Sequence, residues 1–551
     1  MSPRVPRHSG TRRKEKRSSA SSASAKEGGT PPDRLKSPAN LAFGSSKLQP
    51  AQFLSVLIFM GAAIAGTMLM LSATRQGISV FTDSTIYLRV ARSLLQGQGF
   101  VQSGGAPLTH YPPLYPTVLA LSGRLAGDLL TGAKWLQTIL YVANLLLVGL
   151  LVYRGTNGSR LAAGFGLLFV LTSQSFLYCH VLVLSEGLFL FLTLVGLLFI
   201  TQYLQSHSSF ALIMATVVIG LACLTRYIGG TLVAGLLSAI VLLDRSDWRK
   251  KIVACSVVSA VFVLPIAVWL VRNLMLSSGL VNRTITYHPI STAPIQYAVE
   301  TLWFAFLFPS TLHIVPKALI LLTFTFFVIV VMVESINHFG IHAEVNRVPL
   351  ICVCFLFVYA GGLVLAVLFV EPKLPFNARI MLPFIILLGI GLIPLWLNAF
   401  QLFSKRRALA VTVVALWAIL LAGHGHRTGR FVDELRRDSM GFESREWQSS
   451  RVIEFVRGLP EDSLIYSNGP DVIDYFAGRR SRMIPHSHGP AGELREMVRH
   501  LEEAQGFLVY FDKITWRGYL IKIEGLKKYA ELRAVYQGRD GAVYRVAKIG
   551  R

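Results

Sequence analysis

Acidic residues are scarce through the middle of this 551-residue chain. Residues 51–423 contain only 9 Asp and Glu against 21 Lys and Arg, and charged residues make up 15% of the whole sequence. A soluble globular domain carries about 25% charged residues, so these few carboxylates cannot solvate the surface of so long a segment. The shortage excludes a soluble enzyme, a disordered protein, and a nucleic-acid-binding protein inferred only from the net charge of +24. A polytopic membrane protein remains.

Cysteine is also rare, and several familiar site motifs are missing. The last of the five cysteines is Cys354, and all five lie in or beside apolar segments, so no disulfide framework or Cys-x-x-Cys site is indicated. No Gly-x4-Gly-Lys-Ser/Thr run marks a nucleotide site, and no Gly-x-Ser-x-Gly turn marks a hydrolase nucleophile. No His, Cys or carboxylate cluster has metal-ligand spacing, so the sequence leaves a divalent metal open without supporting one.

The first 50 residues have a composition of their own. They contain 11 Lys and Arg, 3 Asp and Glu, and few large apolar residues, which is typical of a disordered tail. Positive charge keeps such a segment on the cytoplasmic side of a membrane. We therefore predict a disordered basic cytoplasmic tail over 1–50, with no cleavable signal.

Eleven apolar segments follow, and each is predicted to be a membrane-spanning helix. They cover residues 53–73, 133–153, 160–178, 183–204, 210–224, 227–243, 251–271, 316–333, 348–370, 379–398 and 408–423. The segments 210–224 and 408–423 are shorter than the roughly 20 residues that a span usually needs. The prediction for 51–423 is an α-helical polytopic domain of about 11 transmembrane helices.

Basic residues in short loops determine the predicted orientation. The Lys- and Arg-rich loops are 153–160, 244–251 and 403–407. The positive-inside rule places them in the cytoplasm with the N-terminus, and an odd number of spans then places 424–551 outside. Residues 74–132 and 272–315 become the two long external segments. Within the second, the apolar run 303–309 is too short to span, and it is predicted to lie at the interface or to re-enter the bilayer.

The last 128 residues have the charge content of a soluble domain, with 22 Lys and Arg and 18 Asp and Glu over 424–551. Helical periodicity alternates here with short strand-like runs. The predicted helices are 444–458, 472–476, 490–504 and 516–530, and the predicted strands are 464–466, 507–511, 533–537 and 542–547. Alternating helices and strands predict a small extracytoplasmic α/β domain.

Ionisable groups near a membrane bundle are costly, and each is a candidate functional residue. The five carboxylates on the predicted outer side of 51–423 are Asp83, Asp128, Glu186, Glu300 and Glu371. Asp83 precedes an amphipathic pattern that runs to Gly97, where Thr82 or Asp83 is expected to cap the helix. Glu186 opens an apolar segment, where a carboxylate also favours the helix N-terminus. Both therefore have a structural as well as a functional reading.

Six short motifs occur in order along the predicted outer side. They are the D-x3-Y-x3-A-x2-L-x2-G pattern from Asp83 to Gly97, P-P-L-Y-P at 112–116, Ser185-Glu186, L-T-R-Y at 224–227, Arg272-Asn273, and Asn377-Ala378-Arg379. Together the motifs resemble the GT-C superfamily of membrane glycosyltransferases over about residues 53–400. The nearest likeness is to the protein O-mannosyltransferase and lipid A aminoarabinose transferase group, of the glycosyltransferase family 39 type.

The resemblance implies a polyprenyl-phosphate-linked sugar as donor and inversion at the sugar carbon. Asp83 would be the general base that accepts the proton of an acceptor hydroxyl, and Glu186 would be a second catalytic carboxylate. The candidates for binding the donor phosphate are Arg226, Arg379, Arg272, Tyr111 and His110. Arginines at a membrane interface can instead extend to the headgroups. The family often has a charged residue before Pro-Pro, whereas this chain has His110-Tyr111.

The sequence therefore predicts an integral-membrane glycosyltransferase. The implied partners are a polyprenyl-phosphate sugar, membrane lipids and a lipid, glycan or protein acceptor, with no nucleic acid. A bacterial inner membrane is the expected location. The alternative is a multi-span transporter or flippase for a lipid-linked or anionic substrate, which would show matched repeats with broken helices. A membrane-anchored scaffold that works through 424–551 is a third reading.

The predicted orientation can be tested with reporter fusions. Fusions after Lys251 and after Gly425 should report opposite sides of the membrane, because the first follows a basic loop and the second follows the last span. Alkaline phosphatase, active only outside the cytoplasm, should be inactive after Lys251 and active after Gly425. Activity on the same side at both positions would contradict the predicted topology.

Overall fold

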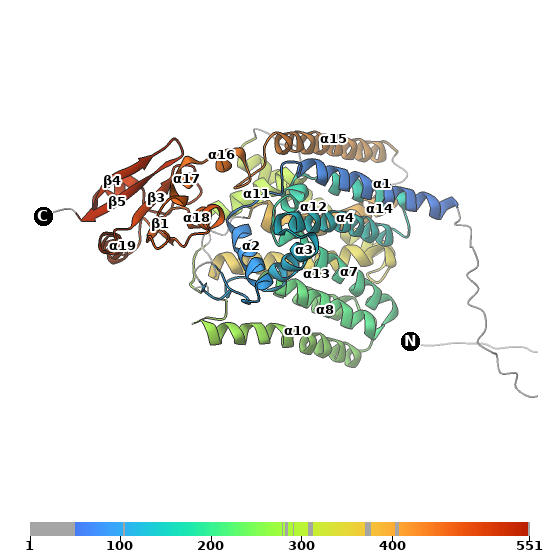
Figure 1. The fold of residues 1–551 in the computed structure, drawn as a ribbon. Helices are drawn as coiled ribbons and strands as arrows, with labels where there is room; N and C mark the ends of the chain where they lie inside the picture. The colour runs from blue at the N-terminus through green and yellow to red at the C-terminus, as the bar shows by residue number, and fades with distance from the viewer. Residues whose placement is uncertain are drawn as a thin grey trace, which may run out of the picture. The chain divides into compact units, whose positions relative to one another are not determined.

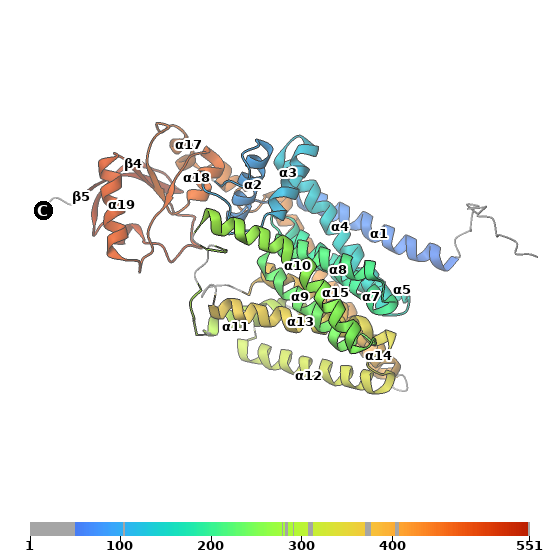
Figure 2. The same cartoon turned by 90° about the horizontal axis from the view of Figure 1, so that it is seen from below.

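The computed structural model describes residues 50–102, 105–277, 279–281, 285–289, 291–306, 312–369, 376–402 and 407–548. Residues 51–551 form one compact unit, and the fold below is that of this unit (Figures 1 and 2). Almost all of the predicted tail, and Glu371, lie outside the described residues.

Helices dominate residues 50–437. They are α1 (Pro50–Ala73), α2 (Thr82–Leu95), α3 (Leu114–Ala126), α4 (Leu129–Gly155), α5 (Arg160–Leu171), α6 (Gln174–His180), α7 (Glu186–Ser206), α8 (Ser209–Thr225), α9 (Gly230–Leu243), α10 (Trp248–Leu276), α11 (Thr292–Phe306), α12 (Ile314–Phe339), α13 (Glu344–Phe369), α14 (Ala378–Leu402) and α15 (Arg407–Arg437). A 3₁₀ turn, η2 (Tyr227–Gly229), links α8 to α9.

Within the described residues, each predicted apolar segment lies largely on a helix, although 183–185 precede α7 and the 160–178 segment is divided between α5 and α6. Seven described helices are long and apolar enough to cross a membrane, or eight if the pair α5 and α6, which meet at a 61° bend, counts as one span. The predicted spans 210–224 and 227–243 correspond to two shorter apolar helices, Ser209–Thr225 and Tyr227–Leu243. The predicted polytopic helical fold is confirmed, with an approximate number of spans.

Helix α15 differs from the prediction at its C-terminal end. The apolar run 408–423 was expected to end at the domain boundary, but the helix continues without interruption to Arg437. Its last turns are amphipathic, and they bury Phe431, Val432 and Leu435. A change of composition marks where a helix leaves an apolar environment, and it does not mark where the helix ends.

The long segment 74–132 contains α2, as its amphipathic pattern predicts, and a second short helix, α3. The N-cap position of α2 is Phe81, whose backbone N–H donates to Ser84 Oγ at 3.1 Å. Asp83 is therefore not the cap, and it lies inside the first turn. In the other long segment, 303–306 belong to α11, while 307–309 lie outside the described residues.

The centre of the helical region is formed by α4, α7, α13 and α14, which pack on one another with α8 and α9 (Figures 1 and 2). Small residues allow close approach. A Cβ atom on Gly132 of α4 would lie 2.5 Å from the backbone nitrogen of Gly123 of α3. Close helix contacts through glycine are typical of membrane proteins. This contact between α3 and α4 holds the C-terminal part of segment 74–132 against the bundle.

The C-terminal region forms a five-stranded mixed sheet with helices, which confirms the predicted combination of helices and strands there. The strands are β1 (Ile465–Ser467), β2 (Arg482–Met483), β3 (Phe507–Phe511), β4 (Ala530–Gln537) and β5 (Gly541–Lys548), in the order β2-β1-β3-β5-β4. β1 is parallel to β2 and β3, whereas β5 is antiparallel to β3 and β4. The longer helices are α17 (Arg451–Arg457), α18 (Pro470–Ala477) and α19 (Ala491–Glu503), and α16 (Arg445–Gln448) is a single turn.

The predicted helix over 516–530 is wrong. Only the four-residue α20 (Ile523–Leu526) forms there, and β4 begins at Ala530. Buried Leu520 and Leu526 pack in a cluster with the sheet residue Leu508. Tertiary packing therefore overrides the weak helical pattern of this segment, which Gly518 and Gly525 interrupt.

Candidate active site

Asp83 lies in the first turn of α2. The residues before this helix, Ser79 and Val80, form backbone hydrogen bonds with two different parts of the chain. Ser79 N donates to Val181 O at 2.9 Å, and Val183 N donates to Ser79 O at 3.0 Å. On the other side, Phe442 N donates to Val80 O at 2.8 Å. These backbone bonds place the start of α2 beside the residues that lead into α7. They also join the C-terminal region to the segment that carries Asp83.

The Asp83 carboxylate has two polar partners. Arg379 Nη2 lies 2.7 Å from Asp83 Oδ2, and Tyr111 Oη donates to Asp83 Oδ1 at 3.0 Å. The side chain of Asp83 keeps 30% exposure. An ionised carboxylate with fixed donors and an open side can accept a proton from an incoming hydroxyl.

Glu186, the first residue of α7, is almost completely buried, with 2% exposure. Its Oε1 atom lies 2.9 Å from Arg379 Nε and 2.9 Å from Arg226 Nη1. Its Oε2 atom is buried and has no hydrogen-bond partner among the described residues. Burying a carboxylate is costly unless cations compensate it, and here two guanidiniums do so.

The two arginines reach the site from breaks in the helical bundle. Arg226 follows α8 in an extended conformation, with φ −147° and ψ 129°, and its Nη1 also donates to Ser185 Oγ at 3.1 Å. Gly229 makes this break tight, since a Cβ atom there would lie 2.7 Å from Cys223 Cα. Arg379 is the second residue of α14. Both side chains are about three-quarters buried.

We call Asp83, Glu186, Arg226 and Arg379 the charge cluster. It contains two carboxylates and two guanidiniums, so its formal charges balance, and Arg379 bridges the two carboxylates. The four residues come from α2, α7, the α8–η2 break and α14. Of the residues predicted from sequence, the structure brings these four and Tyr111 together.

The electrostatic environment keeps Asp83 ionised. Burial raises the pKa of its carboxyl, but the charge of Arg379 and the hydrogen bonds from Arg379 and Tyr111 outweigh burial and leave the pKa below its ordinary value. Arg226 adds a smaller effect in the same direction. At neutral pH the group is therefore a carboxylate.

Arg272 and His110 contact residues that lie next to the charge cluster along the chain or in space. Arg272 Nη1 donates to Leu108 O at 2.6 Å, and its guanidinium lies over the Trp269 ring at 4.4 Å. The ring of His110 packs edge-on against that of Tyr111, with centroids 5.0 Å apart. Arg272 therefore holds the strand-like segment that leads into Tyr111.

Tyr87 belongs to the first sequence motif but received no predicted role, and Gln137 was missed altogether. Tyr87 lies one turn after Asp83, its ring packs against Tyr111 and Tyr115, and its Oη lies 3.3 Å from Ser185 Oγ. Burial raises the pKa of the Tyr87 phenol, so the group stays neutral. Gln137 of α4 donates to Tyr115 Oη at 3.0 Å. A glutamine within an apolar span was a signal that could have identified it.

The part of the chain that the structure describes contains no group of three or more His, Cys, Asp or Glu residues placed to hold a metal ion. Glu186 and Asp83 share Arg379 between them. A ligand bound at the charge cluster would meet the guanidiniums of Arg226 and Arg379 as well as the two carboxylates. The two cations make this environment suited to anions.

Part of the chain matches a known protein family. The family model described as dolichyl-phosphate-mannose-protein mannosyltransferase matches residues 110–269, which include Tyr111, Glu186 and Arg226. No curated protein matches the chain. The match covers less than a third of the sequence, and it ends before Arg379.

Solved structures extend the likeness to most of the chain. ArnT from Cupriavidus metallidurans bound to undecaprenyl phosphate superposes with a TM-score of 0.56 and 13% identity, over 89% of this chain and 97% of that one. The same protein in the apo state gives a TM-score of 0.56 and 11% identity, over 90% and 98%. The chain shares this fold, and the predicted resemblance to the GT-C membrane glycosyltransferases is confirmed.

The contact geometry predicts that Glu186 is needed for stability. Glu186→Gln should lower the free energy of unfolding by about 2–3 kcal/mol, because two guanidiniums lose their shared counter-ion. This expected loss of unfolding free energy is smaller than that for a fully buried ion pair, because the side chains of both arginines are about one-quarter exposed. Denaturant titration in detergent micelles measures it.

Glu344→Gln is the matched control. Glu344 keeps 66% exposure and pairs with Arg347 at 3.3 Å, and exposed pairs contribute about 0–1 kcal/mol. Equal losses in the two variants would show that Glu186 has no special structural role.

Proposed function

We propose that this chain is an integral-membrane inverting glycosyltransferase that moves a sugar from a polyprenyl-phosphate carrier to an acceptor hydroxyl outside the cytoplasm. The main observation behind this proposal is that the Asp83 carboxylate lies between Tyr111 and Arg379, with the guanidinium of Arg226 nearby. A base next to cations is what transfer from a phosphate-linked sugar requires.

In the proposed reaction, Asp83 accepts the proton of the acceptor hydroxyl as the oxygen attacks C1 of the sugar. The bond between C1 and the phosphate oxygen breaks with inversion, and the carrier phosphate leaves with the bonding electron pair. A hydroxyl is a weak nucleophile near neutral pH, so a positioned carboxylate accelerates this step by roughly 10²–10⁴-fold. The 30% exposure of Asp83 leaves room for the hydroxyl.

Arg379 and Arg226 are the proposed phosphate ligands. The contacts among the described residues use Nε and Nη2 of Arg379 and Nη1 of Arg226. A guanidinium has five N–H donors, so each can bind a phosphate oxygen while it keeps its carboxylate. Their charge would stabilise the leaving phosphate as the sugar bond breaks.

The geometry favours a positioning role for Glu186. Its carboxylate is 2% exposed and shares one oxygen between the two arginines. Two guanidiniums that approach one phosphate would otherwise repel each other in a medium of low dielectric constant. Glu186 is therefore proposed to hold the phosphate ligands in place, and Asp83 alone to accept the proton.

The location of the charge cluster supports an extracytoplasmic reaction. Arg226 and Arg379 lie at the start of α9 and α14, and the basic loops follow the far ends of these helices at 244–251 and 403–407. The site and the basic loops are thus one span apart, and the positive-inside rule places the loops in the cytoplasm. We propose a bacterial inner membrane, with the C-terminal domain outside.

A lipid carrier is supported by the ArnT structure of the same fold, which contains undecaprenyl phosphate. The acceptor is proposed as a hydroxyl on a lipid, a glycan or a protein. Membrane lipids are proposed to surround the apolar helices on which the site is built, because seven described helices are long and apolar enough to span a membrane.

The test of the proposed base is a transfer assay with purified protein in detergent. Radiolabelled sugar on a polyprenyl phosphate is supplied with mixed membrane lipids and glycans, with and without a chelator. Asp83→Asn should reduce transfer by at least 10²-fold, since an amide cannot accept the proton. Loss of transfer with chelator would add a metal to the proposal.

Asp128→Asn is the matched control, since Asp128 caps α4 through Thr131 N at 2.8 Å and lies on the same predicted side. Its transfer rate should stay within a few-fold of the unmodified protein. Equal transfer by the Asp83→Asn and unmodified proteins would overturn the assignment of the base.

The pH dependence of transfer gives a second test. Because the pKa of Asp83 lies below its ordinary value, kcat/KM should stay level as the pH falls from 7 to about 5 and decline only near or below about 4. Arg379→Gln removes the main influence that lowers the pKa of Asp83, so burial, which raises this pKa, has less opposition. The acidic limb of the kcat/KM profile should therefore move to higher pH. Arg379→Lys, which keeps the charge, should move it less. An acidic limb that is identical in all three proteins would contradict the role of Arg379.

A further inference from the structure

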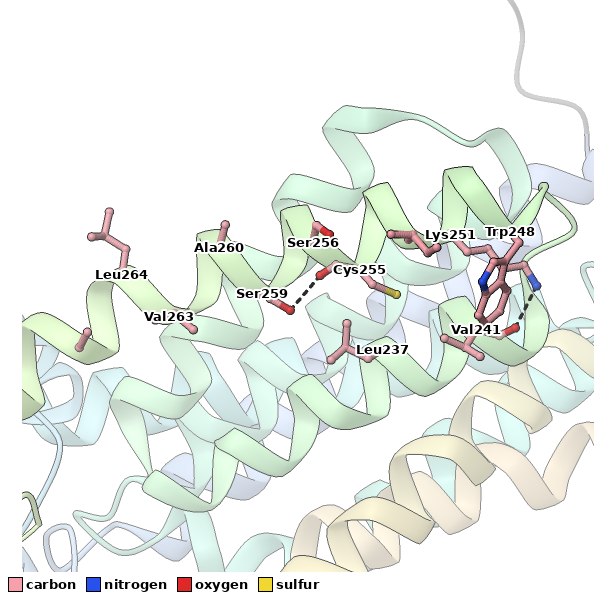
Figure 3. A pocket seen from close by; sticks show the side chains of 12 residues that line it. Leu237, Val241, Trp248, Lys251, Cys255, Ser256, Ser259, Ala260, Val263 and Leu264 are labelled. Atoms are coloured by element: carbon pink, nitrogen blue, oxygen red, sulfur yellow. Dashed lines mark hydrogen bonds between the residues drawn. The ribbon is translucent and has the colours of Figure 1, made fainter.

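A groove lies between α9 and α10, and Figure 3 shows the side chains that line it. Its volume is about 950 Å³, and its walls are mostly apolar, including Leu237, Val241, Ile252, Val263 and Leu264. Several of these side chains are half exposed or more. In a chain of membrane-spanning helices, such a groove faces lipid.

The α10 wall of the groove is about as long as the bilayer is thick, and α9 contributes Leu237 and Val241. The lining positions on α10 run from Trp248 to Ala267, which is roughly 28 Å at 1.5 Å per residue. The hydrocarbon core of a bilayer is about 30 Å thick. An acyl chain therefore fits along the groove from either end.

The charged residue among the groove's described lining, Lys251, lies at one end, whereas Ser256 and Ser259 are neutral polar residues farther along. Figure 3 shows Lys251 and Trp248 together at the charged end, with Lys251 Nζ donating to Val241 O at 2.9 Å. This bond fixes the ammonium at the mouth of the groove, where the indole of Trp248 is exposed. Tryptophan and lysine are the residues that anchor helices at lipid headgroups.

A second cavity of about 590 Å³ lies on the other face of α10 at the same end, and Arg245, Arg249 and Lys250 line it. All three are exposed. With Lys251 they make four cations, which we call the α10 basic cluster.

The carboxylates near the α10 basic cluster do not neutralise it. Asp244 is 2% exposed and accepts hydrogen bonds from Tyr203 at 3.1 Å and from Ser246 at 2.9 Å. His207 Nδ1 lies 3.4 Å from the same carboxylate. Asp247 is the one exposed carboxylate of the 244–251 loop, so the exposed charge there is positive.

We propose that this end of α10 is a binding site for an anionic phospholipid. The phosphate lies at the α10 basic cluster, and an acyl chain lies in the groove between α9 and α10. Basic pockets between transmembrane helices on the cytoplasmic side are suited to acidic headgroups, and each Lys or Arg near the surface contributes about fivefold in affinity.

The bound phosphate would not belong to the reacting donor. Lys251 and Arg272 are 21 positions apart on α10, which is roughly 32 Å. Arg272 contacts Leu108, close to Tyr111 and the charge cluster. A phosphate at Lys251 is therefore a membrane thickness away from Asp83.

The test uses the full chain in phosphatidylcholine nanodiscs, with tryptophan fluorescence as the readout. Brominated phosphatidylglycerol or brominated phosphatidylcholine is added at the same mole fraction, and Trp248→Phe isolates the emission of Trp248 from the other seven tryptophans. Brominated phosphatidylglycerol should quench Trp248 at several-fold lower mole fraction than brominated phosphatidylcholine. No transfer reaction is involved, so the result is independent of the proposed function.

Variants locate the site. Lys251→Gln should reduce the preference about fivefold, the double change Arg249→Gln and Lys250→Gln should reduce it further, and Lys251→Arg should keep it. Arg154→Gln, which removes an exposed cation from the end of α4, is the matched control and should leave the preference unchanged.

Three results would overturn the proposal. One is equal quenching by both brominated lipids, which would mean that the groove contacts bulk lipid only. Another is a preference that survives Lys251→Gln and the double change. The third is displacement of brominated phosphatidylglycerol by undecaprenyl phosphate at a lower mole fraction than by unlabelled phosphatidylglycerol, which would assign the groove to the carrier.

Discussion

The bridge that Arg379 makes between Asp83 and Glu186 is the contact on which the arrangement of the site depends. Its Nη2 and Nε atoms lie 2.7 Å and 2.9 Å from the two carboxylates. Without it, two negative charges would stand close together in a poorly solvated region, where repulsion is strong. Arg226 compensates the remaining charge on Glu186. A site whose charges balance in the resting protein can be buried, and it can still offer guanidinium N–H groups to a phosphate.

The segment before α2 connects this site to the C-terminal domain. Ser79 pairs with the backbone before α7, and Val80 accepts from Phe442 on its other side. Gly441, at φ +63°, makes this approach feasible, since a Cβ atom there would lie 2.1 Å from Val80 O. Helix α18 also packs on α2. The C-terminal domain therefore supports the helix that carries Asp83, which gives it a structural role in the site.

Cations lie at both ends of α10. At one end, Arg272 holds the Leu108 carbonyl and so the approach to Tyr111. At the other end, Lys251 lies in the mouth of an apolar groove, with more cations exposed beside it. The proposed chemistry and the proposed lipid contact are separated by the thickness of the membrane. Both follow from the cost of placing charge within hydrocarbon, which concentrates cations at helix ends.

The class of fold and four charged candidates for the site, Asp83, Glu186, Arg226 and Arg379, could be predicted from the sequence. Apolar segments longer than ordinary core helices require a membrane, and isolated ionisable residues such as Asp83 and Arg379 are conspicuous in such surroundings. The tertiary structure alone decided how they are paired. Asp83 and Arg379 are 296 positions apart, and no local pattern encodes a contact across that distance. It also decided against a helix at 516–530, because side-chain burial in the sheet outweighs a weak local preference.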